Sequence, residues 1–261
     1  MKNQKAIVIT VIIFAALGLT FWLGYESGPK STPASENKPP DTREAPLPPE
    51  VQPIVHIERT FQIPPRDPSA KSNLIDLTSW YNAGLTVDWH KTTPGNNLGT
   101  VPSGLQTFAE TEFDVRGLIQ VCGSNLGIVP YPRRVEGIRV GLRCSKLHFL
   151  HNALLGSRPP QRETIGTYIV HYADNESETI PLQMGENILD WWDSSTQLPP
   201  GGPTVLAWEG RNAHSKKLNK NIHVNKFTWN NQRADMEVAT LDFVSAAKTP
   251  APFLIAITAE P

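Results

Sequence analysis

The sequence lacks a surplus of charge of either sign. Lysine and arginine total 24 against 25 aspartate and glutamate, which leaves a formal net charge of -1. From Lys71 onward the balance is similar, with 17 basic and 18 acidic residues. No basic stripe able to neutralise a phosphate backbone is visible, so the composition argues against nucleic acid as a partner.

Motifs for nucleophilic catalysis and phosphate binding are also missing. No Gly-x-Ser-x-Gly run occurs, and the glycines of residues 200–203 (PGGP) are followed by neither a lysine nor a helical pattern. Asp190 and Asp193 could act as paired carboxylates, but the sequence gives no cleft to hold them. We therefore predict no catalytic residue, and a hydrolase is the weakest of three functional hypotheses.

The histidines do not follow a metal-binding spacing. His148 and His151 lie three positions apart on a predicted strand, where they point to opposite faces and cannot easily chelate one ion. His171, on another predicted strand, is interpreted as a hydrogen-bonded residue of a sheet. His and Cys residues at zinc-site spacing are absent, so we predict neither a metal site nor a cofactor.

Cysteine is scarce, since Cys122 and Cys144 are the only two. In an exported domain an even pair favours a disulfide, which would stabilise a fold by about 3 kcal/mol for a loop of this length. The alternative is two buried thiols on neighbouring strands, because spacing alone does not show that the two Cβ atoms face each other.

Only one long hydrophobic run is present. Residues 6–24 (AIVITVIIFAALGLTFWLG) carry no charge, and a helix of that length spans roughly 28 Å, close to the hydrocarbon thickness of a bilayer. Lys2 and Lys5 precede the run and Glu26 is the first charge after it. The positive-inside rule then places residues 1–5 in the cytoplasm and the later domain outside. We expect a single-pass protein held in the lipid bilayer; cleavage of the run as a signal peptide would make it secreted.

A proline-rich stretch follows the hydrophobic run. Residues 25–70 contain 11 of the 24 prolines, mixed with Ser, Thr, Glu and Lys. Proline removes backbone donors and charge keeps the chain solvated, so we predict a disordered, extended linker. The alternating stretch Ile54–Ile63 could instead be a first strand packed on the domain. The folded domain is placed at residues 71–261.

Apolar repeats of helical spacing are absent after Gly24, and from Leu74 onward apolar and polar residues alternate instead. Strands are predicted over residues 114–121, 166–173, 239–244 and 253–259. Within the first, Val115 would face the core, and Arg116 and Gln120 the opposite side. Many short strands separated by turns, without helices between them, are typical of an all-β antiparallel sandwich or jelly roll.

Several strand and turn sequences between Leu74 and Glu260 resemble the galactose-binding-like jelly rolls that accompany bacterial surface proteins and glycoside hydrolases. These sequences are Leu147–His151, Tyr168–Asp174, Ile180–Leu182, Gly185–Trp192, Ala207–Gly210, Leu241–Ser245 and Phe253–Thr258. They are similar in particular to domains of membrane-anchored envelope proteins of the planctomycete and verrucomicrobial kind. The resemblance implies binding of glycans or proteins, and in many members a structural calcium. No acidic run like an EF-hand loop is present to support calcium here.

Adjacent tryptophans give the one indication of recognition. Trp191 and Trp192 fall at a predicted strand end, where only one can face the core and the other should lie at a rim. An exposed indole stacks well on a sugar ring or on a protein surface. The candidate ligand-binding residues are Asp190, Trp191, Trp192, Trp208 and Asn212. The alternative is that both adjacent tryptophans only fill and cover the core.

Three functions therefore follow from the sequence, in order of preference. The first is a membrane-anchored, extracytoplasmic binding or scaffolding module that recognises envelope glycan. The second is a protein–protein interaction or sensory domain of an envelope complex, and the third is the hydrolase.

Overall fold

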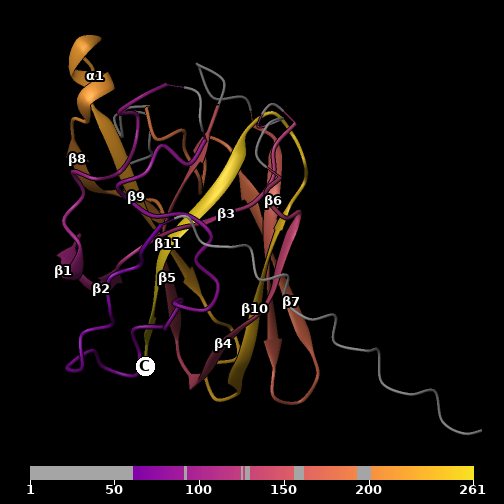
Figure 1. Cartoon of the computed structure of the whole chain (residues 1–261). Coiled ribbons are helices and arrows are strands. Elements are labelled where there is room, and N and C mark those ends of the chain that lie inside the picture. The colour runs from indigo at the N-terminus through magenta and orange to yellow at the C-terminus, as the bar shows by residue number, and fades with distance from the viewer. Residues whose placement is uncertain (1–60, 91–92, 125, 127–129, 156–161, 193–200) are drawn as a thin grey trace, which may run out of the picture. The chain divides into compact units, whose positions relative to one another are not determined.

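Two antiparallel β-sheets packed face to face form the folded part of the chain in a computed structural model (Figure 1). The structure describes residues 61–90, 93–124, 126, 130–155, 162–192 and 201–261. The predicted membrane helix, residues 6–24, lies outside the described residues. Within them, no helix has the length and apolar character needed to cross a membrane.

The larger sheet has five strands in the order β3-β11-β5-β9-β8. Its strands are β3 (Ile119–Gln120), β11 (Ala251–Glu260), β5 (Lys146–Leu154), β9 (Ile222–Asn230) and β8 (Thr204–Gly210). The smaller sheet has the order β4-β10-β6-β7. Its strands are β4 (Arg134–Arg143), β10 (Glu237–Ser245), β6 (Thr164–Tyr172) and β7 (Ser177–Gln183). A hairpin of β1 (Gly104–Phe108) and β2 (Thr111–Val115) and the short helix α1 (Ala213–Lys217) complete the described elements. These elements confirm the predicted all-β class with antiparallel pairing.

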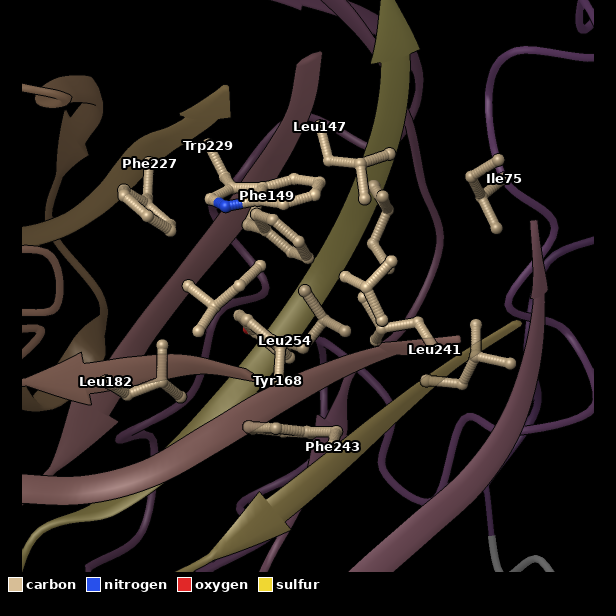
Figure 2. Packing of buried hydrophobic residues seen from close by; sticks show 14 of the residues in the cluster. Ile75, Leu147, Phe149, Tyr168, Leu182, Phe227, Trp229, Leu241, Phe243 and Leu254 are labelled. Atoms are coloured by element: carbon tan, nitrogen blue, oxygen red, sulfur yellow. The ribbon is translucent and has the colours of Figure 1, made fainter. Parts of the chain in front are cut away.

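The main core lies between the two sheets (Figure 2). Alternate residues of β5 and β6 point inward, as the period of two requires. Phe149 and Tyr168 stack with ring centroids 4.3 Å apart, and Phe243 on β10 lies 5.0 Å from Tyr168. Aromatic pairs at these distances contribute about 1 kcal/mol each beyond the area they bury.

A second core covers the other face of the five-stranded sheet. Residues 83–101 and the β1–β2 hairpin lay Trp89, Leu98 and Phe113 against Leu150 of β5 and Phe253 of β11. Both faces of the larger sheet are therefore buried. This burial explains why β11 is apolar along almost its whole length rather than alternating. In the smaller sheet, β4 and β7 do alternate between buried and exposed positions.

Residues 61–70, assigned to the linker from the sequence, are part of this fold. Ile63 packs on the main core. The Arg66 guanidinium donates to Asp114 at 3.0 Å and to the Leu74 carbonyl oxygen at 2.6 Å. The fold thus begins ahead of residue 71. In the described part of residues 71–103 only isolated bridges occur, at Leu74 and Ala83, so the alternation read there does not reflect strands.

Arg116 and Gln120 are buried, although the sequence placed them on a polar face. Arg116 is 1% exposed and donates to both carboxylate oxygens of Asp114 at 2.9 Å and to Asp76 at 2.8 Å. Gln120 accepts from the indole N–H of Trp89 at 2.9 Å. Gln120 is buried because the second core covers the outer face of the larger sheet. Arg116 follows the end of β2 and lies over the ring of Tyr81, which belongs to the main core. Only specific partners make such burial tolerable.

Candidate functional site

One end of the sandwich brings together most of the residues selected from the sequence. Helix α1 stands at this end, opposite the C-terminus (Figure 1). Here β5 and β9 diverge after the pair His151–Asn225, and residues 190–192 fill the gap between them. The Trp191 N–H donates to the Ala153 carbonyl oxygen at 3.0 Å, and the His223 N–H donates to the Trp191 carbonyl oxygen at 2.7 Å. These backbone bonds fix both adjacent tryptophans.

Trp191 and Trp192 have different environments. Trp191 is 2% exposed and belongs to the second core, with its ring 5.4 Å from that of Trp89 and 6.4 Å from that of Phe253. Trp192 is half-buried, edge-on to Trp191 at 6.0 Å and 5.6 Å from the His214 ring. The expectation of one core tryptophan and one rim tryptophan agrees with this burial. Trp191 itself cannot offer its ring to a ligand.

Asp190 is also buried, at 3% exposure, and its carboxylate accepts from the Trp192 N–H at 2.8 Å. Its observed role is to hold the Trp192 backbone rather than to present a carboxylate to a ligand. Asp193, its predicted partner in a carboxylate pair, lies outside the described residues.

Trp208 contributes a second half-buried indole at this end. It is opposite Val224 on β9, so it lies on the outer face of the larger sheet and packs on the second core. Its ring covers Gly210, where an added Cβ would lie only 2.3 Å from Cζ2 of the indole. Glycine at this position therefore lets the indole lie flat against the strand.

Asn212 is not available to a ligand, which corrects its selection from the sequence. It is 1% exposed, and its Oδ1 accepts from the Ser215 N–H at 2.7 Å, capping α1. Its Nδ2 donates to Asn96 Oδ1 and to the Asn97 carbonyl oxygen, both at 3.0 Å. The Asn212 side chain thus joins α1 to the loop that contains Asn96 and Asn97. Asn212, selected as a residue at the end of a strand, is a helix cap instead.

Exposed cations surround α1 and were missed by the sequence reading. Arg211, Lys216, Lys217 and Lys220 are all exposed, and residues 211–221 contain no acidic residue. The signal was available in the sequence. It was overlooked because the charge balance was judged over the whole domain, where this local excess cancels.

Glu209 and His223 form an ion-pairing contact beside this surface. The His223 imidazole donates through Nε2 to Glu209 at 2.9 Å, with the histidine 4% and the carboxylate 46% exposed. This hydrogen bond holds the pKa of Glu209 below its ordinary value. Glu209 therefore presents a negative charge at neutral pH.

Three buried side chains of β8 and β9, His223 among them, hold polar atoms without a hydrogen-bond partner. They are Thr204 Oγ1, His223 Nδ1 and both amide atoms of Asn225. Thr204 pairs with Phe227, and Asn225 and His223 lie two and four positions before Phe227 on β9. All three side chains therefore lie on the face of the larger sheet that Phe227 turns toward the main core. Such groups cost about 1–3 kcal/mol each when nothing satisfies them.

The three histidines that the sequence analysis weighed as metal ligands, His148, His151 and His171, all have hydrogen-bond partners in the protein. His148 contacts Glu260, His151 contacts Tyr168 and Asn187, and His171 contacts Asp242. Across the residues that the structure describes, no three His, Cys, Asp or Glu side chains converge as a metal site requires.

Cys122 and Cys144 are free thiols, so the predicted disulfide is not formed. The Cys122 N–H donates to the carbonyl oxygen of Pro132, just before β4, whereas Cys144 follows the end of that strand. A ten-residue strand spans roughly 30 Å, far beyond the reach of a disulfide. Burial raises the pKa of the Cys144 thiol to about 11, so it stays protonated.

Comparison of the chain with family models gives no match, and neither does comparison with curated proteins.

Proposed function

We propose that this chain is a membrane-tethered, extracytoplasmic module that binds polysaccharide at the α1 end of its sandwich. The observation that carries the proposal is the pair of half-buried indoles, Trp192 and Trp208, at one end of the larger sheet. Indole faces stack on the apolar faces of sugar rings. Both indoles pack against the second core, and we propose that both contact the sugars of one polysaccharide chain.

Both indoles are held before any ligand arrives. Trp192 is fixed by the Asp190 carboxylate and by edge-on contacts to Trp191 and His214. Trp208 lies flat against Gly210. Ordering a flexible side chain on binding costs about 0.5–1.5 kcal/mol, and these two rings avoid most of that cost.

The fold supports the same proposal. Two facing antiparallel sheets with the last strand, β11, next to the middle strand β5 suit a jelly roll of the galactose-binding-like kind. We further propose that residues 6–24 hold the chain in the bilayer with residues 1–5 in the cytoplasm, and that the proline-rich stretch after them is the spacer. Envelope glycan is then the polysaccharide within reach.

Co-sedimentation of the full-length protein with insoluble cell-wall polysaccharides tests the proposal. Trp192→Ala and Trp208→Ala should each raise the dissociation constant about 5- to 150-fold, taking stacking on a sugar to contribute on the order of 1–3 kcal/mol, as stacking on a nucleic-acid base does. Trp80→Ala is the matched control, because Trp80 is also half-buried but contacts β4 through the Glu136 carbonyl oxygen. Failure of the unaltered protein to sediment with any polysaccharide would refute the proposal.

A second candidate is a protein-binding module, favoured by the exposed edge of the larger sheet. β8 is the last strand of that sheet, and Val205 on it is 38% exposed. A partner strand could pair with this edge. A protein retained in native-membrane pull-downs after glycan digestion, and lost with Val205→Lys, would favour this candidate.

A further inference from the structure

Helix α1 and its flanking residues concentrate positive charge on one small surface. We call residues 211–221 the basic turn. Arg211, Lys216, Lys217 and Lys220 give it four positive charges and it has no negative one, in a chain whose net charge is -1. Trp192 lies beside the basic turn, since its ring is 5.6 Å from the ring of His214.

The backbone that carries these cations is fixed. Asn212 and Ser215 cap α1 reciprocally, with the Asn212 N–H donating to Ser215 Oγ at 3.0 Å. The Arg211 guanidinium donates to Asn221 Oδ1 at 2.6 Å and to Asn219 Oδ1 at 3.1 Å. These bonds close the turn on itself. The lysines therefore project from a defined position rather than from a loose loop.

The lysine ammonium groups are not used within the fold. Lys216, Lys217 and Lys220 are exposed and form no ion pair with any residue in the described part of the chain. The carboxylates of Glu209, Asp88 and Asp190 near this surface each accept a hydrogen bond from the protein, and Glu209 keeps its negative charge beside Arg211. Glu209 accepts from His223, and Asp88 accepts from the Gly95 N–H and from the Asn97 side-chain amide.

From this arrangement we infer that the polysaccharide bound at the α1 end is anionic. Its sugar rings stack on Trp192 and Trp208, and its carboxylate or phosphate groups meet the ammonium groups of Lys216 and Lys217. The inference rests on the proposed function and adds the charge of the ligand to it. Anionic lipid is the competing source of negative charge, but a membrane surface needs a wide apolar face beside the cations. Among the residues of the basic turn, all of which the structure describes, Leu218, at 52% exposure, is the one large exposed apolar side chain.

The test compares polygalacturonate with its fully methyl-esterified form, which keeps the backbone and loses the charge. Dissociation constants are measured by calorimetry for the full-length protein in detergent. The unaltered protein should bind the acid form at least about fivefold more tightly, since exposed ion pairs contribute a few-fold each. Raising NaCl from about 0.1 M to about 1 M shortens the Debye length from about 10 Å to about 3 Å and should remove the difference.

Lys216→Gln/Lys217→Gln should lower affinity for the acid form about fivefold and leave the ester unaffected. Arg139→Gln/Arg143→Gln is the matched control, because it removes two exposed cations from β4. Equal binding of acid and ester, both lost in Trp192→Ala, would overturn the anionic ligand while the proposed function stands. Binding to neither form of polygalacturonate and to no other polysaccharide would overturn both the anionic ligand and the proposed function. Binding to phosphatidylglycerol vesicles alone, lost in the lysine variant, would overturn the polysaccharide in favour of lipid.

Discussion

His151 is a buried base between the two sheets, and protonating it should destabilise the fold. It is fully buried, with Nε2 donating to the Asn187 carbonyl oxygen at 2.8 Å and Nδ1 accepting from the Tyr168 hydroxyl at 3.0 Å. This pattern uses both nitrogens of the neutral ring, and a second proton on Nδ1 would require the Tyr168 hydroxyl to turn from donor to acceptor. Burial lowers the pKa of His151 from 6.5 to about 4.

The sign and size of the effect follow from linkage. Between the two pKa values the unfolded chain binds the proton and the folded chain does not, so stability falls as pH falls. One pKa unit corresponds to about 1.4 kcal/mol, so His151 should remove about 2 kcal/mol by pH 5 and about 3 kcal/mol by pH 4. Above pH 7 its contribution is constant.

Urea unfolding of the full-length protein across this range measures the effect. His151→Gln keeps a donor for Asn187 but cannot be protonated, so its unfolding free energy should fall less between pH 7 and pH 4. The difference between the two slopes isolates His151 from His90 and His148, whose pKa values burial also lowers. Parallel pH profiles for both proteins would refute the reasoning.

Three further substitutions should change stability in directions set by local contacts. Asn225→Leu replaces a buried amide without hydrogen bonds, so the unfolding free energy should rise by about 1–3 kcal/mol; a loss on urea unfolding would mean the amide is satisfied. Ala109 and Glu110 both have positive φ, at 45° and 66°, in the β1–β2 turn. Ala109→Asn/Glu110→Gly should therefore add about 1 kcal/mol by calorimetry, because this turn type favours Asn-Gly, and an unchanged melting temperature would count against it. Arg116→Met leaves the buried Asp114 with fewer partners and should cost about 3–5 kcal/mol. A melting temperature within error of the original would contradict that ion-pair network.

The strands that alternate most regularly were predictable from sequence. Residues 166–173 and 239–244 fall within or largely within β6 and β10, because β-branched and aromatic residues at a period of two suit a sheet with a buried face. Residues 253–259 fall within β11 and were predictable as a short apolar run instead. Residues 71–103 were not predictable in this way. Ile75, Leu77 and Tyr81 pack in the main core, and Trp89 and Leu98 pack in the second core. The described part of this stretch forms only isolated bridges, so alternation of apolar and polar residues does not mark strands there.

The candidate site was predictable only as a pair of tryptophans. The sequence suggested a strand end at which Trp191 and Trp192 face opposite ways. The two residues do differ in burial, but they lie in a turn that follows the bridge at Asp190. Asp190 accepts from the Trp192 N–H, and Asn212 accepts from the Ser215 N–H. These roles depend on the local backbone conformation, so they could not be predicted from the sequence. The basic turn required only local counting of charge, whereas its position beside Trp192 required the fold.

Oxidative footprinting of the tryptophans tests the central claim most directly. The full-length protein is treated with hydroxyl radicals with and without bound polysaccharide, and oxidation of each tryptophan is read by mass spectrometry. We expect polysaccharide to protect Trp192 and Trp208 and to leave Trp80 unchanged. Equal oxidation of Trp192 and Trp208 in the free and bound protein would contradict a binding site at the α1 end.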